Sequence, residues 1–292
     1  MDLNRLQEYN KDHCWQYDIR LENLESDLKE CGLTKEYVET LGVSDFSFVV
    51  VSNKDEQKLL KRFIERHEWL GNISQYPTHW FAAYHKDILA GVIIMNMPNA
   101  FSKILGEKTK DLERLISRGA CISWSPKNLA SSFLMWSIKW MVKNTQYRLF
   151  TAYSDPTAKE IGTIYQACNF YYMGKKSGTV VRYINPYTGK VVSDRFFRQR
   201  SAYKRYANEL GIEWQKEWTT RTGINWKIIP DDIELQLRKF SKEKQSLSER
   251  IEFPSKHKYA YILGNTKTET KKFRTLYESR NKVLEYPKDR GN

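Results

Sequence analysis

The stretch ISRGACISWSPKNLASSFLMWSIKWM, residues 116–141, decides the fold. A short apolar segment runs into the polar turn Ser125-Pro126-Lys127-Asn128, and an amphipathic helix follows. Ser125 is a candidate N-cap, and Pro126 suits a first helical turn. In α/β enzymes a strand, a tight turn and a helix in this order often hold a phosphate, usually with the help of glycine. This turn contains no glycine.

The sequence around this stretch alternates between strand and helix patterns. Apolar and β-branched runs such as FSFVVVS and HWFAAYHKDILAGVIIMNMP indicate strands, the second run being two strands around a turn near Lys86. KDEQKLLKRFIERHEWLG and AKEIGTIYQACN have helical spacing, and FYYMGKKSGTVVRYINPYTG indicates a hairpin. The predicted order is β-α-ββ-β-α-β-α-ββ, an α/β fold.

The pattern divides the chain into four segments. We expect an N-terminal helical cap over residues 1–45 and a catalytic core over residues 46–190. Residues 191–252 change to long, basic helices studded with aromatic residues, which we interpret as an insertion before the last core strand. Residues 253–292 contain that strand, KHKYAYILG, and a basic tail that we expect to be loosely held.

The composition predicts a folded cytoplasmic protein. The chain of 292 residues is 40% hydrophobic and 14% aromatic, which favours a packed core over disorder. No apolar run is long enough to cross a bilayer, and the N-terminus lacks the apolar stretch of a signal peptide. The four cysteines are scattered, which argues against a zinc site or a disulfide framework.

The excess of basic residues is concentrated in the C-terminal part of the sequence. Residues 1–174 contain 21 Lys and Arg against 21 Asp and Glu, whereas residues 175–292 contain 27 against 14. The whole net charge of +13 therefore lies in the last part of the chain. Basic residues interleaved with aromatic ones predict a nucleic-acid partner, although a solvated basic surface gives the same composition.

The element order resembles the GNAT acyltransferase fold, and so does the motif IGTIYQACNFYYMG. Tyr165 and Phe170 take the places of the family's Tyr and Phe, and Asn169 replaces its Gly. Asn is the next best residue for a left-handed helix end. The resemblance implies a mixed, mostly antiparallel sheet that splays between its fourth and fifth strands, where family members bind their substrates.

Within that group, the sequence is similar to the Mom proteins of phages over residues 60–175. The matching segments are RLISRGACISWSPKNLASSFLMWSI and AYSDPTAKEIGTIYQACNFYYMG. This resemblance implies an enzyme that transfers a small acyl-derived group to the N6 amine of adenine in double-stranded DNA. The modification would protect phage DNA from restriction nucleases, and the adenine would be flipped out of the duplex.

The resemblance to acyltransferases also implies acetyl-CoA or a related acyl donor. Arg118, Ser123, Ser125, Lys127 and Asn128 are then the candidate cofactor-binding residues. Without glycine, and with Pro126 lacking an N–H, the turn is less able to wrap a pyrophosphate, which leaves a DNA phosphate or a different donor as alternatives. In a regular strand Arg118 and Ser123 face opposite sides, so both can serve one site only if a bulge intervenes.

Four residues are candidate catalytic groups. Tyr165 occupies the family's position for a general acid, and Tyr153 is placed to stack on a flipped base. Asp155 follows the same strand as Tyr153 and is a candidate base, with an N-cap as the alternative. His67, at a helix end, is a candidate catalytic residue, and with Asp155 a possible ligand pair for divalent iron. The structural alternative for each is ordinary packing or capping.

The basic segment carries the candidate nucleic-acid contacts. These are Arg198, Arg200, Tyr203, Lys204 and Arg205. Its alternative reading is an amphipathic helix with a solvated charged face. Two other functions remain open from the sequence: an acyl-CoA-dependent acetyltransferase acting on tRNA or another amine, and a non-enzymatic nucleic-acid-binding protein.

Overall fold

The computed structural model describes residues 14–73, 76–98, 103–175, 179–221 and 223–288. The chain divides into two compact units, of which one contains residues 178–254 and the other residues 11–177 and 255–292. The predicted insertion over residues 191–252 falls within the first unit, which also takes in the strand that precedes it. Residues 14–45 of the predicted helical cap and the described part of the tail belong to the second unit, while residues 1–13 of the cap lie outside the described residues.

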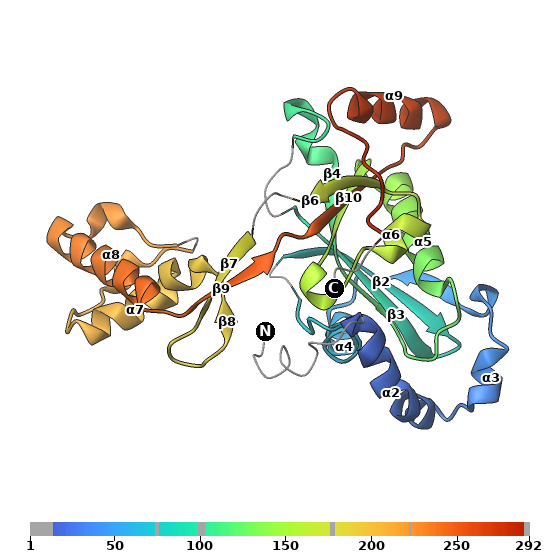
Figure 1. Cartoon of the computed structure of the whole chain (residues 1–292), viewed down its shortest axis with the longest axis horizontal. Helices are drawn as coiled ribbons and strands as arrows, with labels where there is room; N and C mark the ends of the chain where they lie inside the picture. Colours follow the sequence, from blue (N-terminus) through green and yellow to red (C-terminus); the bar gives the residue numbers. More distant parts are fainter. Residues whose placement is uncertain (1–13, 74–75, 99–102, 176–178, 222, 289–292) are drawn as a thin grey trace. The chain divides into compact units, whose positions relative to one another are not determined.

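The larger unit is built on a seven-stranded mixed sheet with the order β1-β2-β3-β4-β5-β10-β6 (Figure 1). All neighbouring strands are antiparallel except β4 and β5, which are parallel. The predicted α/β fold with a mixed, mostly antiparallel sheet is therefore confirmed. The strands are β1 (Ser47–Val50), β2 (Pro77–His85), β3 (Ile88–Asn96), β4 (Glu113–Cys121), β5 (Leu149–Ser154), β6 (Tyr171–Lys175) and β10 (His257–Ile262).

Helices cover both faces of this sheet. Alternate strand residues face opposite sides, so Ile93 belongs to one core cluster with Phe133 of α5, while Val92 belongs to another with the apolar residues of α4. On α4, Leu60, Phe63 and Ile64 are buried at helical spacing. The helices are α2 (Trp15–Cys31), α3 (Lys35–Glu39), α4 (Lys54–His67), α5 (Leu129–Asn144), α6 (Thr163–Ala167) and α9 (Lys267–Glu278), with 3₁₀ turns η1 (Val43–Asp45), η2 (Glu107–Leu112) and η3 (Pro156–Ala158).

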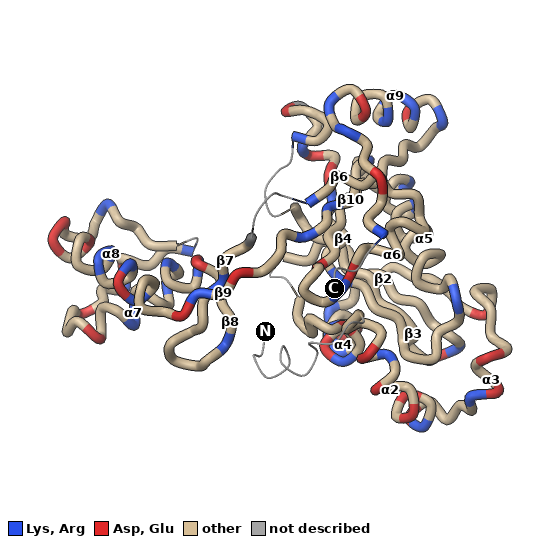
Figure 2. Tube along the Cα trace, in the orientation of Figure 1, with Lys and Arg blue, Asp and Glu red and all other residues tan. Residues whose placement is uncertain are grey.

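The smaller unit has its own sheet and core. Its sheet has the order β8-β7-β9, and its core includes Tyr203, Tyr206 and Leu237 from the two helices. The elements are β7 (Thr179–Ile184), β8 (Val191–Val192), η4 (Asp194–Arg198), α7 (Arg200–Glu209), η5 (Lys216–Trp218), η6 (Trp226–Ile228), α8 (Asp231–Ser246) and β9 (Arg250–Pro254). Both α7 and α8 carry basic and acidic residues (Figure 2).

Two predicted features are wrong. The expected hairpin over residues 170–189 does not form, because β6 pairs with β10 while β7 pairs with β8 and β9 in the other sheet. The tail is not loosely held along residues 267–278, which form α9. Tyr277 of α9 is fully buried, and Thr266 caps the helix through the N–H of Glu269. The high Lys content of this segment hid its apolar face.

A third correction concerns the start of α5. Ser125 does not cap it: the helix begins at Leu129, and Asn128 precedes it with a φ of 70°. The predicted left-handed residue at the end of α6 is confirmed, since Asn169 has a φ of 58°. Among the described residues, every helix is too short or too polar to span a lipid bilayer.

Candidate functional site

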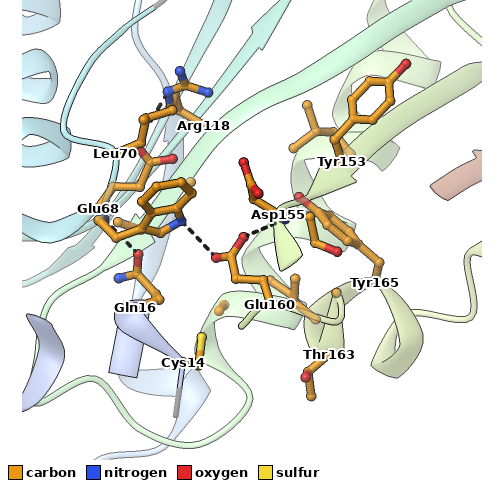
Figure 3. A pocket seen from close by; sticks show the side chains of 18 of the residues that line it. Cys14, Gln16, Glu68, Leu70, Arg118, Tyr153, Asp155, Glu160, Thr163 and Tyr165 are labelled. Atoms are coloured by element: carbon orange, nitrogen blue, oxygen red, sulfur yellow. Dashed lines mark hydrogen bonds and ion pairs between the residues drawn. The ribbon is translucent and has the colours of Figure 1, made fainter. Parts of the chain in front are cut away.

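A pocket opens where β4 and β5 separate. Their parallel pairing runs from Glu113 and Leu149 to Ile116 and Ala152, after which β4 continues along β3 and β5 along β10. The sheet therefore splays at the predicted position. The gap between residues 117–121 and 153–155 leads into a pocket with a volume of about 330 Å³ (Figure 3).

A bulge in β4 shapes one wall of the pocket. Ile94 pairs with Arg118 and Met95 with Ile116, so Ser117 is an extra residue on β4. The Ser117 hydroxyl donates to the backbone oxygen of Ile94 at 3.1 Å and to Oδ1 of Asn96 at 2.7 Å. Arg118, which follows the bulge, lines the pocket. The bulge lies before Arg118 and not between Arg118 and Ser123, so it does not bring the two residues to one face of the strand.

The Arg118 guanidinium is held by the protein itself. Nη2 donates to Oδ1 of Asn72 at 2.9 Å, and Nε donates to the Asn72 backbone oxygen at 2.5 Å. Nε also lies 3.4 Å from a carboxylate oxygen of Glu68. These contacts occupy most of the N–H donors of the guanidinium. Arg118 therefore stabilises the pocket wall and has few donors left to bind an anion.

Of the three carboxylates in the pocket, Glu68 has the fewest polar partners among the described residues. Its side chain is 12% exposed, and Oε2 accepts no hydrogen bond from the described residues, with Arg118 as its ion-pair partner. Burial raises the pKa of Glu68 to about 8, and the negative charge of Glu160 adds to the increase while Arg118 opposes it. Near neutral pH this carboxyl group therefore exchanges readily between its two protonation states.

Glu160 lies between two donors on opposite sides of the pocket. Its Oε1 accepts the Trp69 indole N–H at 3.1 Å, and its Oε2 accepts the Asp155 backbone N–H at 3.2 Å (Figure 3). Burial raises the pKa of Glu160 to about 7, and the hydrogen bond from Asp155 opposes the increase. Glu160 thus joins the end of α4 to the loop after β5.

Both candidate tyrosines line the pocket. The ring of Tyr165 packs 5.3 Å from those of Phe170 and Tyr259, measured between centroids. Burial, reinforced by the charges of Glu160 and Glu68, raises the pKa of the Tyr165 phenol, which therefore stays protonated at neutral pH. Tyr153 is 41% exposed and lies at the edge of the pocket (Figure 3).

Asp155 lines the pocket and also has the capping role that was its alternative reading. Its Oδ1 accepts the N–H of Thr157 at 3.0 Å and caps η3, while Oδ2 lies 2.9 Å from Nζ of Lys256. With both oxygens occupied, Asp155 is less suited than Glu68 to accept a proton.

His67 is not among the residues that line the pocket. Its ring packs 4.2 Å from that of Phe63, and Nδ1 lies 3.6 Å from the Asp27 carboxylate. Burial lowers the pKa of His67, so the ring is neutral near pH 7. Asp155 faces the pocket, and within the described parts of the chain no three His, Cys, Asp or Glu side chains gather as a metal site. The structure gives no support for the predicted iron site.

The turn between β4 and α5 is covered on one side by α2. Ser123 and Ser125 are buried, and side chains of α2 bond to the backbone of both residues. Lys127 and Asn128 are exposed. Arg118 is thus brought to the pocket and Ser123 is not, so the five candidate cofactor residues do not form one open site.

The candidate nucleic-acid residues lie in the smaller unit. Arg198 and Lys204 are exposed, Arg198 paired with Asp194, and the exposed Arg200 donates to the Thr220 backbone oxygen at 2.9 Å. Tyr203 is 4% exposed and belongs to the unit's core, so it is not positioned to stack on a base.

Arg205 stacks 4.0 Å from the Tyr187 ring centroid. The solvated charged face and the buried aromatic face expected of this amphipathic segment are therefore both present.

The sequence reasoning missed several pocket residues. Glu160 and Lys256 were not identified, and Glu68 was noted only as a neighbour of His67. Glu160 follows Lys159, which has a φ of 54°, and no helix or strand period predicts where a side chain points after such a residue. The acidic Glu68 next to the aromatic Trp69, just after a helix end, was the available signal.

The fold and the pocket together define an α/β protein with a buried, acid-lined site at the splay of a mixed sheet. The chain belongs to the Mom protein family, whose model matches residues 49–288. No curated protein matches the sequence significantly.

Solved structures with a similar chain path include acetyltransferases. An acetyltransferase from Bacillus subtilis in complex with CoA has a TM-score of 0.36 and 10% identity, over 75% of this chain and 99% of that one. A GNAT family acetyltransferase from Elizabethkingia anophelis with acetyl-CoA bound has a TM-score of 0.35 and 11% identity, over 75% and 99%. Similarities at this level do not define a donor or a substrate.

Proposed function

We propose that this protein is an acyl-transfer-type enzyme that modifies the N6 amine of adenine in double-stranded DNA and so protects the DNA from restriction nucleases. Membership of the Mom family supports the class of substrate. The observation that carries the chemistry is the buried carboxyl of Glu68, whose Oε2 accepts no hydrogen bond from the described residues and has Arg118 as its ion-pair partner. This carboxyl shares one pocket with the Tyr165 phenol.

The pocket is suited to a flipped base. Its volume of about 330 Å³ is at the small end of the range for small-molecule sites. Apolar side chains line the pocket, and Tyr153 at the edge offers a ring for stacking. The apolar lining residues are Ile93, Ile116, Phe133, Leu134 and Ile164.

The chemistry needs one base and one acid. The N6 lone pair is conjugated with the purine ring, so N6 attacks only as it loses a proton. In the proposed step N6 forms a bond to the electrophilic carbon of the donor, and the bond from that carbon to its leaving group breaks. The N6 proton passes to Glu68 and the Tyr165 proton passes to the leaving group. Exchange with solvent then restores both residues.

The other acids of the pocket position this pair. Glu160 fixes Trp69, the residue next to Glu68, through the indole hydrogen bond, and Asp155 is fixed by Lys256. Burial keeps water away from Glu68, which strengthens it as a base. No metal ion is needed for this route, and none is assigned to it.

Two basic surfaces are available for DNA phosphates. In the smaller unit, Arg198, Arg200 and Lys204 are exposed. In the larger unit, α9 exposes Lys267, Lys271 and other cations (Figure 2). Residues 178–254 contain 15 Lys and Arg against 10 Asp and Glu, while residues 255–292 contain 10 against 4, so the C-terminal segment is the more strongly basic. Phosphate contacts of this kind provide affinity without sequence preference.

The test is to express the protein in a bacterium and to analyse nucleosides from its DNA and tRNA by mass spectrometry. The proposal predicts a new deoxyadenosine mass with the wild type and its loss with Glu68→Gln. Glu65→Gln is the matched control, because Glu65 lies on the same α4 but is exposed.

The outcomes separate the alternatives. An acylated tRNA nucleoside without a DNA adduct would support the tRNA acetyltransferase. Unmodified DNA and tRNA, with DNA binding retained by the purified protein, would support a non-enzymatic binding protein.

A further inference from the structure

Glu68 stands at the point where α4 ends. Its N–H still bonds to the Ile64 oxygen at 3.1 Å, but its own backbone is extended. Glu68 lies between α4 and β2, outside both elements. The regular geometry of a helix or strand therefore does not set where its side chain points, and other contacts must hold the carboxyl in the pocket.

The side chain of Gln16, on α2, bonds to the backbone on both sides of Glu68. Its Nε2 donates to the His67 oxygen at 2.6 Å, and its Oε1 accepts the Trp69 N–H at 3.2 Å (Figure 3). The first group belongs to the peptide unit before Glu68 and the second to the peptide unit after it. Because each peptide unit is planar, fixing the two units fixes φ and ψ of Glu68, and with them the direction of its Cα–Cβ bond.

The rest of α2 is held at the end of α4 by other side chains. Nδ2 of Asn23 donates to the Arg66 backbone oxygen at 3.1 Å. The Trp15 ring meets the Trp69 ring edge to face, with 5.4 Å between the centroids. These contacts dock the helix, so removal of the Gln16 amide leaves them in place.

The helix that carries Gln16 lies outside the part of the chain that the Mom family model matches, which begins at residue 49. Glu68 and Trp69 lie inside the matched part. Family membership therefore does not predict the contacts of Gln16, although the residues that it holds belong to the family's region.

We propose that Gln16 is a positioning residue for the reaction: it holds the backbone at Glu68 so that the carboxyl of this residue faces the N6 amine of the adenine. The inference rests on the proposed function, which assigns Glu68 as the base. Both polar groups of the Gln16 amide are bound to the backbone, so it acts through Glu68 and not on the substrate.

Release of this hold changes Glu68 in a way that a general loss of packing does not. The charged groups that act on its carboxyl are Arg118 of β4, Glu160 of the loop after β5 and Lys256 before β10, and burial is the largest cause of its raised pKa of about 8. A carboxyl that is free to turn toward water loses part of this burial, and its pKa falls. The change is therefore visible in the titration of one side chain.

The first experiment measures this titration in the full-length protein by carbon-13 NMR of labelled glutamate carboxyls, with the Glu68 signal assigned through its absence in Glu68→Gln. We expect a midpoint near pH 8 in the wild type. In Gln16→Met, which keeps the size of the side chain and removes both hydrogen bonds, the midpoint should be at least about one pH unit lower. Asn23→Leu is the matched control, because it removes the bond from the same helix to Arg66 and leaves the midpoint unchanged. Equal midpoints in Gln16→Met and wild type would overturn the inference.

The second experiment follows the reaction on a duplex oligonucleotide, with a low-molecular-mass extract of the producing bacterium that supplies the donor. Gln16→Met should lower the apparent kcat about 10–100-fold and leave KM for DNA within about twofold, because a displaced base impairs the chemical step and not the binding. The rise in rate between pH 7 and pH 9 should shrink from about tenfold to about twofold as the midpoint falls. Asn23→Leu should match the wild type in all three quantities.

Gln16→Asn is the conservative variant. It keeps an amide in the pocket, but a side chain shorter by one carbon cannot reach both peptide groups, so it should share the effects of Gln16→Met. Wild-type kinetics and titration in Gln16→Asn would contradict the positioning role, and so would a raised KM with an unchanged kcat, since Gln16 would then contact the substrate itself. If the wild type leaves DNA unmodified, the proposed function fails, and the NMR titration still decides whether Gln16 holds Glu68.

Discussion

Replacing Glu68 by Gln tests the assignment of the base, and it predicts two separate effects. Gln keeps the shape of the side chain but accepts no proton, so the variant loses the transfer from N6. General base catalysis typically contributes 10²–10⁴-fold, and we expect kcat/KM to fall by about that factor. In the wild type the rate rises with pH and levels off above pH 8, because Glu68, with a pKa of about 8, acts only when ionised. Between pH 7 and pH 9 the rise is about tenfold.

The same substitution has a calculable effect on stability. In the folded protein the pKa of Glu68 is about 8, whereas the ordinary pKa of a glutamate side chain, which applies to the unfolded chain, is 4.5. The folded state therefore binds the extra proton between these values, and the free energy of unfolding falls as the pH rises through this range. At about 1.4 kcal/mol per pH unit, the total is up to about 5 kcal/mol. Gln does not ionise, so the Glu68→Gln variant escapes this loss.

The assays are rate measurements by mass spectrometry on a duplex oligonucleotide, and denaturant unfolding at pH 5, 7 and 9. We expect the variant to be nearly inactive yet to lose less stability than the wild type between pH 5 and pH 9. Glu65→Gln should match the wild type in both. Equal activity of Glu68→Gln and wild type, or parallel stability curves, would refute the assignment of Glu68 as a buried base.

Three further predictions follow from the site. Tyr165→Phe should reduce the modification rate by about 10²-fold or more with unchanged circular dichroism, because it removes the general acid and keeps the ring; a rate within twofold of wild type would exclude this role. Gly162→Ala should destabilise the protein by at least about 1–3 kcal/mol in thermal unfolding, since Gly162 has a φ of 69° and a Cβ there would lie 2.5 Å from the Tyr259 ring; an unchanged transition contradicts it. Lys204→Ala should lower the slope of log K against log salt for duplex DNA by about 1, measured by fluorescence anisotropy; an identical slope would remove Lys204 from the DNA contacts.

Much of the fold was accessible from the sequence because local rules decided it. The strand and helix periods gave the element order of the core, and Asn169 showed a left-handed helix end without glycine. The splay between β4 and β5 came from the resemblance to a known fold. The two misassigned elements, the hairpin over residues 170–189 and α9, depended on which distant segment each would pack against.

The site was predicted only in part for a related reason. Tyr153 near the end of β5, Asp155 directly after it and Tyr165 of α6 all line the pocket. Glu160 was missed, because its direction is set by a left-handed residue and by a hydrogen bond from Trp69, which is 91 positions away in the chain. The covering of the turn by α2 was equally invisible, because nothing in the sequence around Arg20 indicates that its partner is a backbone oxygen of a distant turn.

The central claim, that the exocyclic amine of a DNA adenine is the acceptor, is tested most directly with two matched duplexes. One contains adenine, and the other contains purine, which lacks only the N6 amine, at the same positions. After incubation with the wild-type protein and the extract that supplies the donor, mass spectrometry should show an adduct on the adenine duplex and none on the purine duplex. Equal adducts on both duplexes, or an adduct on a base other than adenine, would contradict the account.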